Sequence, residues 1–295
     1  MRVVVTGSTG LIGSALVPAL REAGHDVVRL VRAGPRAPDE AAWDPVAGTV
    51  DRARLEGAHA VVNLAGAGIG DRRWTAAYRR TVRDSRVLGA RTLVRALLED
   101  DRTPRVLVQA SAVGFYGSRG EEILTERSPG GRGFLADVVR AVEAETEPAR
   151  DAGIRICLAR TGLVMSPNGG AFPPVLRMIR LGLGGRLGNG RQWWPWITLD
   201  DEVRALLFLL EGHVCGPVNL TAPGPERNRD LIAALGRACG RPTVLPAPYP
   251  VLRLALGAFA RDVVASQRAV PARLLDEGFA FRHPDLASAA PWMVG

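Results

Sequence analysis

Residues 1–32 read MRVVVTGSTGLIGSALVPALREAGHDVVRLVR, and this stretch decides the fold class. The β-branched run at residues 3–5 is followed by glycines, and apolar residues then recur at helical spacing from Leu11 to Leu20. A second apolar run extends from Val27 to Val31. A strand, a helix and a second strand in this order form a βαβ unit, which requires a parallel sheet.

The rest of the first half repeats this alternation. Further strands are expected at Ala60–Leu64, Val106–Ala110 and Ile154–Leu158, and helices at Thr75–Leu98 and Phe134–Arg150. Strands that alternate with helices predict an α/β fold, here a Rossmann-type doubly wound parallel sheet with helices on both faces.

The second half has a looser pattern and predicts a smaller α/β lobe over residues 166–295, added to a first domain over residues 1–165. Some of its elements are expected to return to the first sheet. The expected elements are a glycine-rich loop after Gly182, a helix from about Asp200, a strand at Pro217–Leu220 and helices near Asp230–Cys239 and Val251–Ala265.

Composition excludes several classes of protein. The 295 residues are 47% hydrophobic and 23% charged, as in an ordinary globular protein. The net charge is +8, yet all 38 basic residues are arginines spread singly or in pairs, which makes nucleic-acid binding unlikely and indicates a solvated arginine-rich surface. No apolar run has membrane-spanning length and none at the N-terminus resembles a signal peptide, so we expect a soluble, cytoplasmic protein.

Neither cysteines nor histidines suggest a metal site. The three cysteines, Cys157, Cys215 and Cys239, are odd in number and far apart, so we interpret them as small buried hydrophobic residues. The four histidines are equally scattered, without the spacing of zinc ligands. We expect no metal.

Gly7, Gly10 and Gly13 form a GxxGxxG motif between the first strand and the first helix. In this context Gly7 permits a tight turn, Gly10 lets the backbone approach a pyrophosphate, and Gly13 allows close packing of helix on strand. The N–H groups of the first helical turn then point at the anion. The alternative is that these glycines only shape a turn.

The end of the second strand selects the nucleotide, because an acidic residue there binds the ribose 2′-hydroxyl of NAD. This chain has Arg32 at that position, and Asp26 lies at the opposite end of the strand. A guanidinium pairs well with a 2′-phosphate, so we favour NADP (NADPH) over NAD. The alternative is that Arg32 is a solvated surface residue.

Several segments together carry a family resemblance: TGSTGLIG, VVNLAGAGI, RRW with DSRV downstream, SAVGFYG, WITLDD and SQRAVPARLLDEGFAFRHPDLASA. They resemble the atypical, epimerase-like branch of the extended short-chain dehydrogenase/reductases, within the NAD-dependent epimerase/dehydratase superfamily. The match covers nearly the whole chain, and the C-terminal segment is its most specific part.

The resemblance implies further cofactor contacts. Residues after the third strand are expected beside the adenine and ribose. Arg86 is expected to contact the phosphates, and Val164 is expected beside the nicotinamide. Without the resemblance, Arg86 would be interpreted as a cation on a helix surface. The full expected set is Gly7, Thr9, Gly10, Leu11, Ile12, Gly13, Arg32, Leu64, Ala65, Gly66, Arg86 and Val164.

The reaction site departs from the family pattern of a serine or threonine, a tyrosine and a lysine four residues after that tyrosine. Phe134 and Val138 stand at the tyrosine and lysine positions, Ala112 at the serine position, and the chain contains no lysine. Ser111 and Tyr116 remain as candidate catalytic residues. Tyr116 matches a tyrosine that lines the family's pocket without donating the proton, so packing is its expected role, and no nearby cation is expected to lower its pKa.

The segment RQWWPWITLDD supplies the other wall of the expected site. Trp193 and Trp196 are candidate substrate-pocket residues, which either stack on a planar or sugar substrate or, with Trp194, plug the core between the lobes. Thr198 stands where relatives often carry a histidine. Asp137, in the first turn of the expected helix at Phe134, is a further candidate near the nicotinamide.

These observations predict an NADP-binding, epimerase-like oxidoreductase that acts on an unidentified small molecule, with a nucleotide sugar as one candidate, through a degenerate Ser/Tyr/Lys site. The alternative is a non-catalytic NADP(H)-binding regulator or scaffold. No membrane partner is expected, and the sequence leaves open whether the chain forms a homodimer.

Overall fold

The computed structural model describes residues 1–99 and 104–295. Its centre is an eight-stranded sheet in the order β12-β8-β6-β5-β1-β2-β3-β4, in which neighbouring strands are parallel except for the pair β3–β4. The strands are β1 Arg2–Thr6, β2 Asp26–Val31, β3 Glu40–Asp44, β4 Thr49–Val50, β5 Ala60–Asn63, β6 Val106–Ala112, β8 Arg155–Thr161 and β12 Gly216–Leu220. The predicted Rossmann-type sheet is therefore confirmed.

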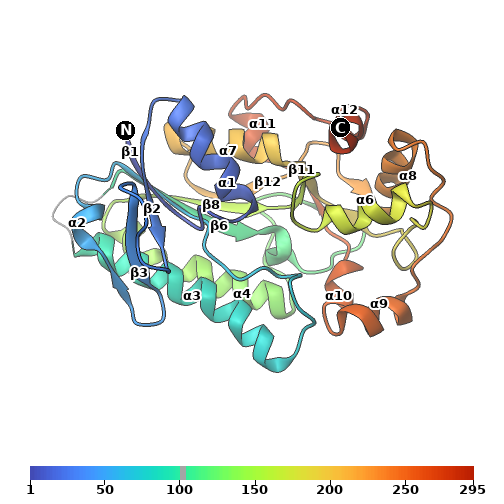
Figure 1. The fold of residues 1–295 in the computed structure, drawn as a ribbon, viewed down its shortest axis with the longest axis horizontal. Coiled ribbons are helices and arrows are strands. Elements are labelled where there is room, and N and C mark those ends of the chain that lie inside the picture. Colours follow the sequence, from blue (N-terminus) through green and yellow to red (C-terminus); the bar gives the residue numbers. More distant parts are fainter. Residues whose placement is uncertain (100–103) are drawn as a thin grey trace.

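Helices cover both faces of this sheet (Figure 1). α1 (Leu11–Glu22) and α7 (Leu199–Glu211) lie on one face, and α3 (Ala76–Leu98) and α4 (Phe134–Ala144) lie on the other. The strands are apolar on both sides because alternate residues enter different cores: Val3 and Val5 belong to one and Val4 to the other.

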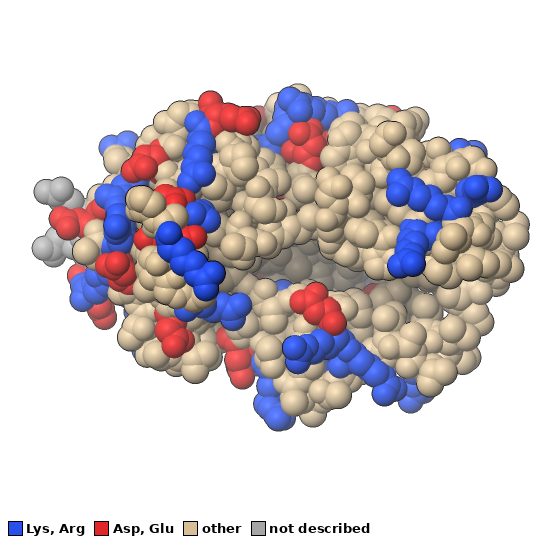
Figure 2. All heavy atoms as spheres, in the orientation of Figure 1, with Lys and Arg blue, Asp and Glu red and all other residues tan. Residues whose placement is uncertain are grey.

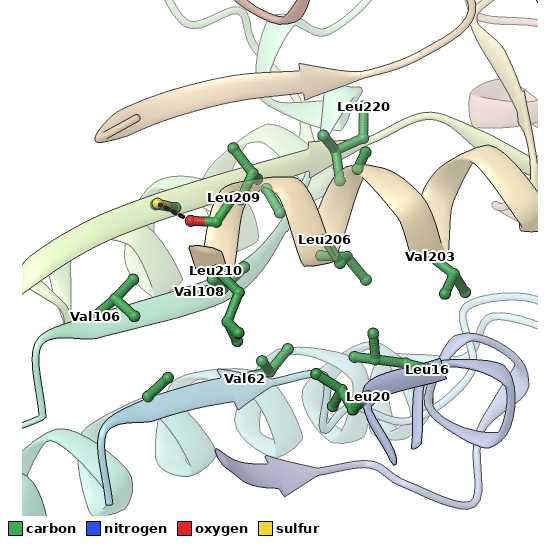
Figure 3. Close-up of a cluster of buried hydrophobic side chains, with 14 of the residues drawn as sticks. Leu16, Leu20, Val62, Val106, Val108, Val203, Leu206, Leu209, Leu210 and Leu220 are labelled. Atoms are coloured by element: carbon green, nitrogen blue, oxygen red, sulfur yellow. Dashed lines mark hydrogen bonds between the residues drawn. The ribbon is translucent and has the colours of Figure 1, made fainter. Parts of the chain in front are cut away.

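Figure 3 shows the first of these cores, where leucine and valine side chains of α7 point across the sheet face toward α1 and the central strands. Leu206 and Leu209 of α7 and Leu16 and Leu20 of α1 are at most 1% exposed. Burial of each such side chain stabilises the fold by about 1.5–3 kcal/mol, so α7 is an integral part of the first domain although it lies far along the chain.

The second half builds a third core from α6 (Phe172–Arg180), α8 (Asn228–Ala238) and α12 (Leu286–Val294), around the buried Trp196. The remaining elements are short: β7 Ile123–Leu124, β9 Leu163–Met165, β10 Trp193–Trp194, β11 Trp196–Thr198, β13 Glu226–Arg227, β14 Arg268–Ala269, the 3₁₀ turn η1 Val113–Tyr116, α2 Arg52–Leu55, α5 Glu147–Asp151, α9 Tyr249–Leu256, α10 Ala260–Val263 and α11 Ala272–Asp276.

The C-terminal segment returns to the first domain. The carboxylate of Asp201, at the start of α7, is buried and accepts the backbone N–H groups of Arg282 and His283 at 2.8 and 2.9 Å. Phe279 packs in the same core as α7. The C-terminal segment is therefore held against the first domain by both hydrogen bonds and apolar packing. Among the described residues, no helix is long and apolar enough to span a membrane.

Three local expectations are wrong. The helix expected at Phe134–Arg150 is divided into α4 and α5, with a proline in the first turn of α5. The helix expected at Val251–Ala265 is divided at Gly257, whose φ of 65° ends α9 in a conformation that favours glycine. Cys215 is exposed, whereas Cys157 is buried and Cys239 is half-buried.

Candidate cofactor and reaction site

The glycine turn after β1 contains one glycine that leaves space for a ligand. A Cβ atom at Gly7, whose φ is 65°, would lie 2.7 Å from the carbonyl carbon of Leu64, and one at Gly13 would lie 2.2 Å from the carbonyl oxygen of Gly7. The fold itself therefore requires these two glycines. A Cβ atom at Gly10 would meet only the Gly7 oxygen, at 3.3 Å. Gly10 thus faces open space at the position where the motif places a pyrophosphate.

The N-terminus of α1 is free to bind an anion. Gly10 is its N-cap and offers no side chain to the first N–H groups, and the first turn contains no acidic residue. Thr9 is exposed, while Leu11 and Ile12 are half-buried. A Cβ atom at Gly169 would lie 2.8 Å from Leu11, so the loop after β9, the strand that holds the half-buried Val164, lies against the start of α1.

Two polar side chains at the ends of β1 and β5, and one in the middle of β6, hold the next turn in place. The hydroxyl of Thr6 donates to Oδ1 of Asn63 at 2.5 Å and accepts the N–H groups of Leu64 and Ala65, each at 3.1 Å. Asn63 in turn donates to Oε1 of Gln109 at 2.8 Å. None of these positioning residues was predicted, although each follows directly on an apolar run (VVVT, VVN and VLVQ).

Arg86 is folded over this turn and is not a helix-surface cation. A Cβ atom at Gly66 would lie 2.9 Å from its Cζ, and its Nη1 donates to the carbonyl oxygens of Ala67 and Val82 at 2.9 and 3.1 Å. Burial is the main cause that lowers the pKa of Arg86. Since a guanidinium stays charged in proteins and this one forms no ion pair among the described residues, it is suited to an anionic ligand.

Arg32 lies exposed at the carboxyl end of β2 and has no side-chain partner within the described ranges. The next carboxylate along the chain, Asp39, bonds to Arg29 at 2.6 and 2.9 Å and to Arg21 at 2.5 Å. The Arg29 hydrogen bond is the main cause that lowers the pKa of Asp39 to about 2. This strand end therefore offers a free guanidinium and a carboxylate that is already paired.

The two candidate catalytic residues belong to one buried polar network. The Ser111 hydroxyl donates to Glu143 at 2.6 Å, and Glu143 forms a two-armed ion pair with Arg160, with both distances at 2.9 Å. Arg160 also donates to the Tyr116 hydroxyl at 3.2 Å, which donates to Oδ1 of Asn219 at 2.7 Å.

The Tyr116 side chain lies fully buried in this network. It is 0% exposed, and burial, the largest effect, raises its pKa although Arg160 acts in the opposite direction. The expectation that no cation lies near Tyr116 is wrong, because Arg160 reaches it from β8, 44 residues further along the chain. Arg119, the nearest cation in sequence, is paired with Glu122.

Phe134, at the position of the family's tyrosine, lies in an aromatic cluster. The edge of the Trp74 ring meets it at 5.2 Å between centroids, and Arg79 lies 4.2 Å above its ring. Trp74 also stacks on Phe259 at 5.0 Å. Asp137 is exposed and paired with Arg140, so it does not join the site.

The tryptophans have different surroundings. Trp196 is 0% exposed within the third core, so its assignment to the substrate pocket is wrong; it packs inside the second lobe and not between the lobes. Trp193 is half-buried, and the guanidinium groups of Arg227 and Arg268 lie over its ring, 4.5 and 4.4 Å from the ring centroid. Thr198 is buried and serves as the N-cap of α7.

Glu202 is a buried carboxyl group that the sequence analysis missed. It is 0% exposed; its Oε1 accepts the Thr161 hydroxyl at 2.8 Å, and its Oε2 has no partner among the described residues. Burial raises the pKa of Glu202 to about 8. The sequence did contain a signal for this burial: Glu202 lies four residues before Leu206 and seven before Leu209, which places it on the apolar face of α7.

Comparison with known proteins agrees with this geometry. Residues 3–220 match the family described as the NAD dependent epimerase/dehydratase family. The chain belongs to that family. Residues 247–292 of this epimerase-family chain also match a domain of unknown function, DUF1731, which corresponds to the C-terminal segment singled out in the sequence.

The relatives cover the whole chain. An epimerase family protein of Mycobacterium bovis is 44% identical over 289 residues, covering 97% of this chain and 95% of the relative. The cattle epimerase family protein SDR39U1 is 36% identical over 295 residues, covering 98% of each. The crystal structure of human SDR39U1 (isoform 2) with NADPH superposes with a TM-score of 0.92 at 32% identity, covering 99% of both chains.

Proposed function

We propose that this epimerase-family chain is an NADP(H)-binding oxidoreductase that acts on an unidentified small molecule. The observation that carries the proposal is the open space at Gly10 in front of the uncapped N-terminus of α1. The human relative whose structure contains NADPH lends support, since it shares the whole fold of this chain.

The residues of this chain have distinct parts in holding the cofactor. The N–H groups after Gly10 hold the pyrophosphate, and the free guanidinium of Arg32 binds the 2′-phosphate that distinguishes NADP from NAD. Arg86 adds a second positive charge beside the turn at Gly66. When bound, NADPH supplies the hydride, and Val164 lies on the strand expected at its nicotinamide end.

The substrate is proposed to carry an anionic group, as a nucleotide sugar does. Trp193 offers a half-buried ring beside Arg227 and Arg268, and only Arg227 of these two arginines forms an ion pair within the described residues. Arginine binds phosphate oxygens through paired N–H groups. Proton transfer is the weak part of the site, since the Ser111 hydroxyl is already committed to Glu143.

A non-catalytic NADP(H)-binding regulator is the second candidate. It is favoured by Phe134, which has no exchangeable proton and is covered by Trp74 and Arg79, and by the full burial of Tyr116. Multiple-turnover oxidation of NADPH with a library of carbonyl compounds supports the oxidoreductase. Tight NADPH binding without turnover for any compound supports the regulator.

The cofactor preference tests the site directly. We expect the protein to bind NADPH more tightly than NADH, and Arg32→Asp to abolish or invert this preference by repelling the 2′-phosphate. Arg36→Asp is the matched control, because Arg36 is an equally exposed arginine four residues further on. Dissociation constants come from titration of cofactor fluorescence. Equal constants for NADPH and NADH in the unmodified protein contradict the assignment of Arg32.

A further inference from the structure

At one end of the molecule, exposed apolar side chains and unpaired arginines come from two stretches that lack acidic residues, although Asp230 and Asp262 border the second stretch. Two stretches of the sequence, residues 152–199 and 231–261, contain no aspartate or glutamate. They supply α6 with the segment that follows it, and the segment from α8 through α9. Eight exposed large apolar side chains come from them: Met178, Leu181, Leu183, Val244, Leu245, Tyr249, Val251 and Leu254. We call this surface the apolar–arginine end.

The two stretches lie side by side at this end of the fold (Figure 1). The N–H of Leu245 donates to the oxygen of Gly184 at 3.3 Å, and the N–H of Ala247 donates to the oxygen of Arg186 at 2.9 Å. On α9, Val251 and Leu254 are 53% and 77% exposed and share one helix face, since they are three residues apart. The segment after α6 and residues 245–247 therefore lie together, and α9, which follows these residues in the chain, presents an apolar face of its own.

The arginines of this end are exposed and without carboxylate partners. Elsewhere on the protein many arginines form ion pairs, for example Arg29 with Asp39 and Arg91 with Glu145. Figure 2 shows blue arginine atoms over tan surface at the end that carries α6 and α8. Eight exposed arginines have no ion pair within the described residues: Arg177, Arg180, Arg186, Arg191, Arg237, Arg241, Arg253 and Arg261.

We propose that the apolar–arginine end docks on an anionic phospholipid surface, with the leucine and valine side chains entering the headgroup boundary and the arginines meeting lipid phosphates. Both attractions act together at such a surface, and each arginine near it contributes about fivefold to the binding constant. A second copy of the chain fits poorly, because a symmetric contact would bring two sets of unpaired arginines together. Nucleic acid also fits poorly, since the exposed side chains are aliphatic except for Tyr249, whereas single strands stack on aromatic rings.

The test is sedimentation with vesicles of phosphatidylcholine alone and of phosphatidylcholine mixed with phosphatidylglycerol. The full-length protein is expected to sediment with the mixed vesicles, much less with the neutral ones, and less again in high salt. Leu254→Gln is expected to weaken binding roughly tenfold. Arg241→Gln combined with Arg253→Gln is expected to weaken it about thirtyfold, the product of two charges.

Control variants make the same changes at the other end of the molecule. Val46→Gln replaces a side chain that is 84% exposed in the turn after β3, and Arg36→Gln with Arg54→Gln removes two exposed charges that form no ion pair within the described residues. These controls are expected to bind as the unmodified protein does. The proposal is overturned if the mixed vesicles fail to sediment the protein, or if both sets of variants behave alike. It is also overturned if light scattering shows a dimer that Leu254→Gln dissociates.

Discussion

The buried carboxyl group of Glu202 makes the stability of this protein depend on pH in a predictable direction. Its pKa is raised from 4.5 to about 8 by burial, with one hydrogen bond from Thr161 to offset that burial in part. The folded pKa lies above the unfolded one, so the contribution of this group is fully present below pH 4.5 and is lost as pH rises through 8. Because one pKa unit corresponds to about 1.36 kcal/mol, the loss reaches about 2 kcal/mol at pH 6 and about 4 kcal/mol at pH 8.

Glu202→Gln isolates this effect. The amide keeps an acceptor for the Thr161 hydroxyl and has the shape of the protonated acid, but it does not ionise. We expect the unmodified protein to lose about 2 kcal/mol of unfolding free energy between pH 6 and pH 8 that the variant retains. Urea unfolding at a series of pH values measures the unfolding free energy of each protein. The contributions of all other titrating groups cancel in the difference between the two free energies.

Glu22→Gln is the matched control, because Glu22 is an exposed carboxylate at the end of α1. Its unfolding free energy is expected to follow that of the unmodified protein at every pH. If the difference between Glu202→Gln and the unmodified protein is the same at pH 6 and pH 8, the carboxyl group ionises normally and the reasoning fails.

Two further predictions concern the cofactor site and the buried network. Gly10→Val is expected to abolish NADPH binding in a protein that still folds, and undiminished NADPH affinity in this variant would contradict the site. Gly13→Ala is expected to lower the unfolding free energy by about 1–3 kcal/mol, because its Cβ atom would lie 2.2 Å from the Gly7 oxygen. Tyr116→Phe is expected to cost about 1–3 kcal/mol of stability by leaving Oδ1 of Asn219 unpaired, with NADPH affinity unchanged within a few-fold. A thousandfold loss of single-turnover hydride transfer in this variant would instead make Tyr116 the proton donor.

Much of the first domain could be predicted from sequence, because its signals are local. Apolar runs and helical spacing placed β1, α1 and β2 within a residue or two. Elements without such a signal were missed: β3 (EAAWD) contains no β-branched residue, and α6 begins with two prolines in its first turn. Helix breaks at Gly257 and before Pro148 were also missed, because each interrupts an otherwise continuous apolar pattern.

By itself the sequence determined the βαβ unit and its glycine turn, because strand, turn and helix there follow from the sterics and periodicity of neighbouring residues. It also established that lysine is absent. Only the tertiary structure decided which groups meet across the fold. Arg160 approaches Tyr116 because β8 lies beside β6 in the sheet, and Tyr116 meets Asn219 from 103 residues away. Contacts of this kind depend on strand order and on how the lobes pack, and no local pattern of residues encodes either.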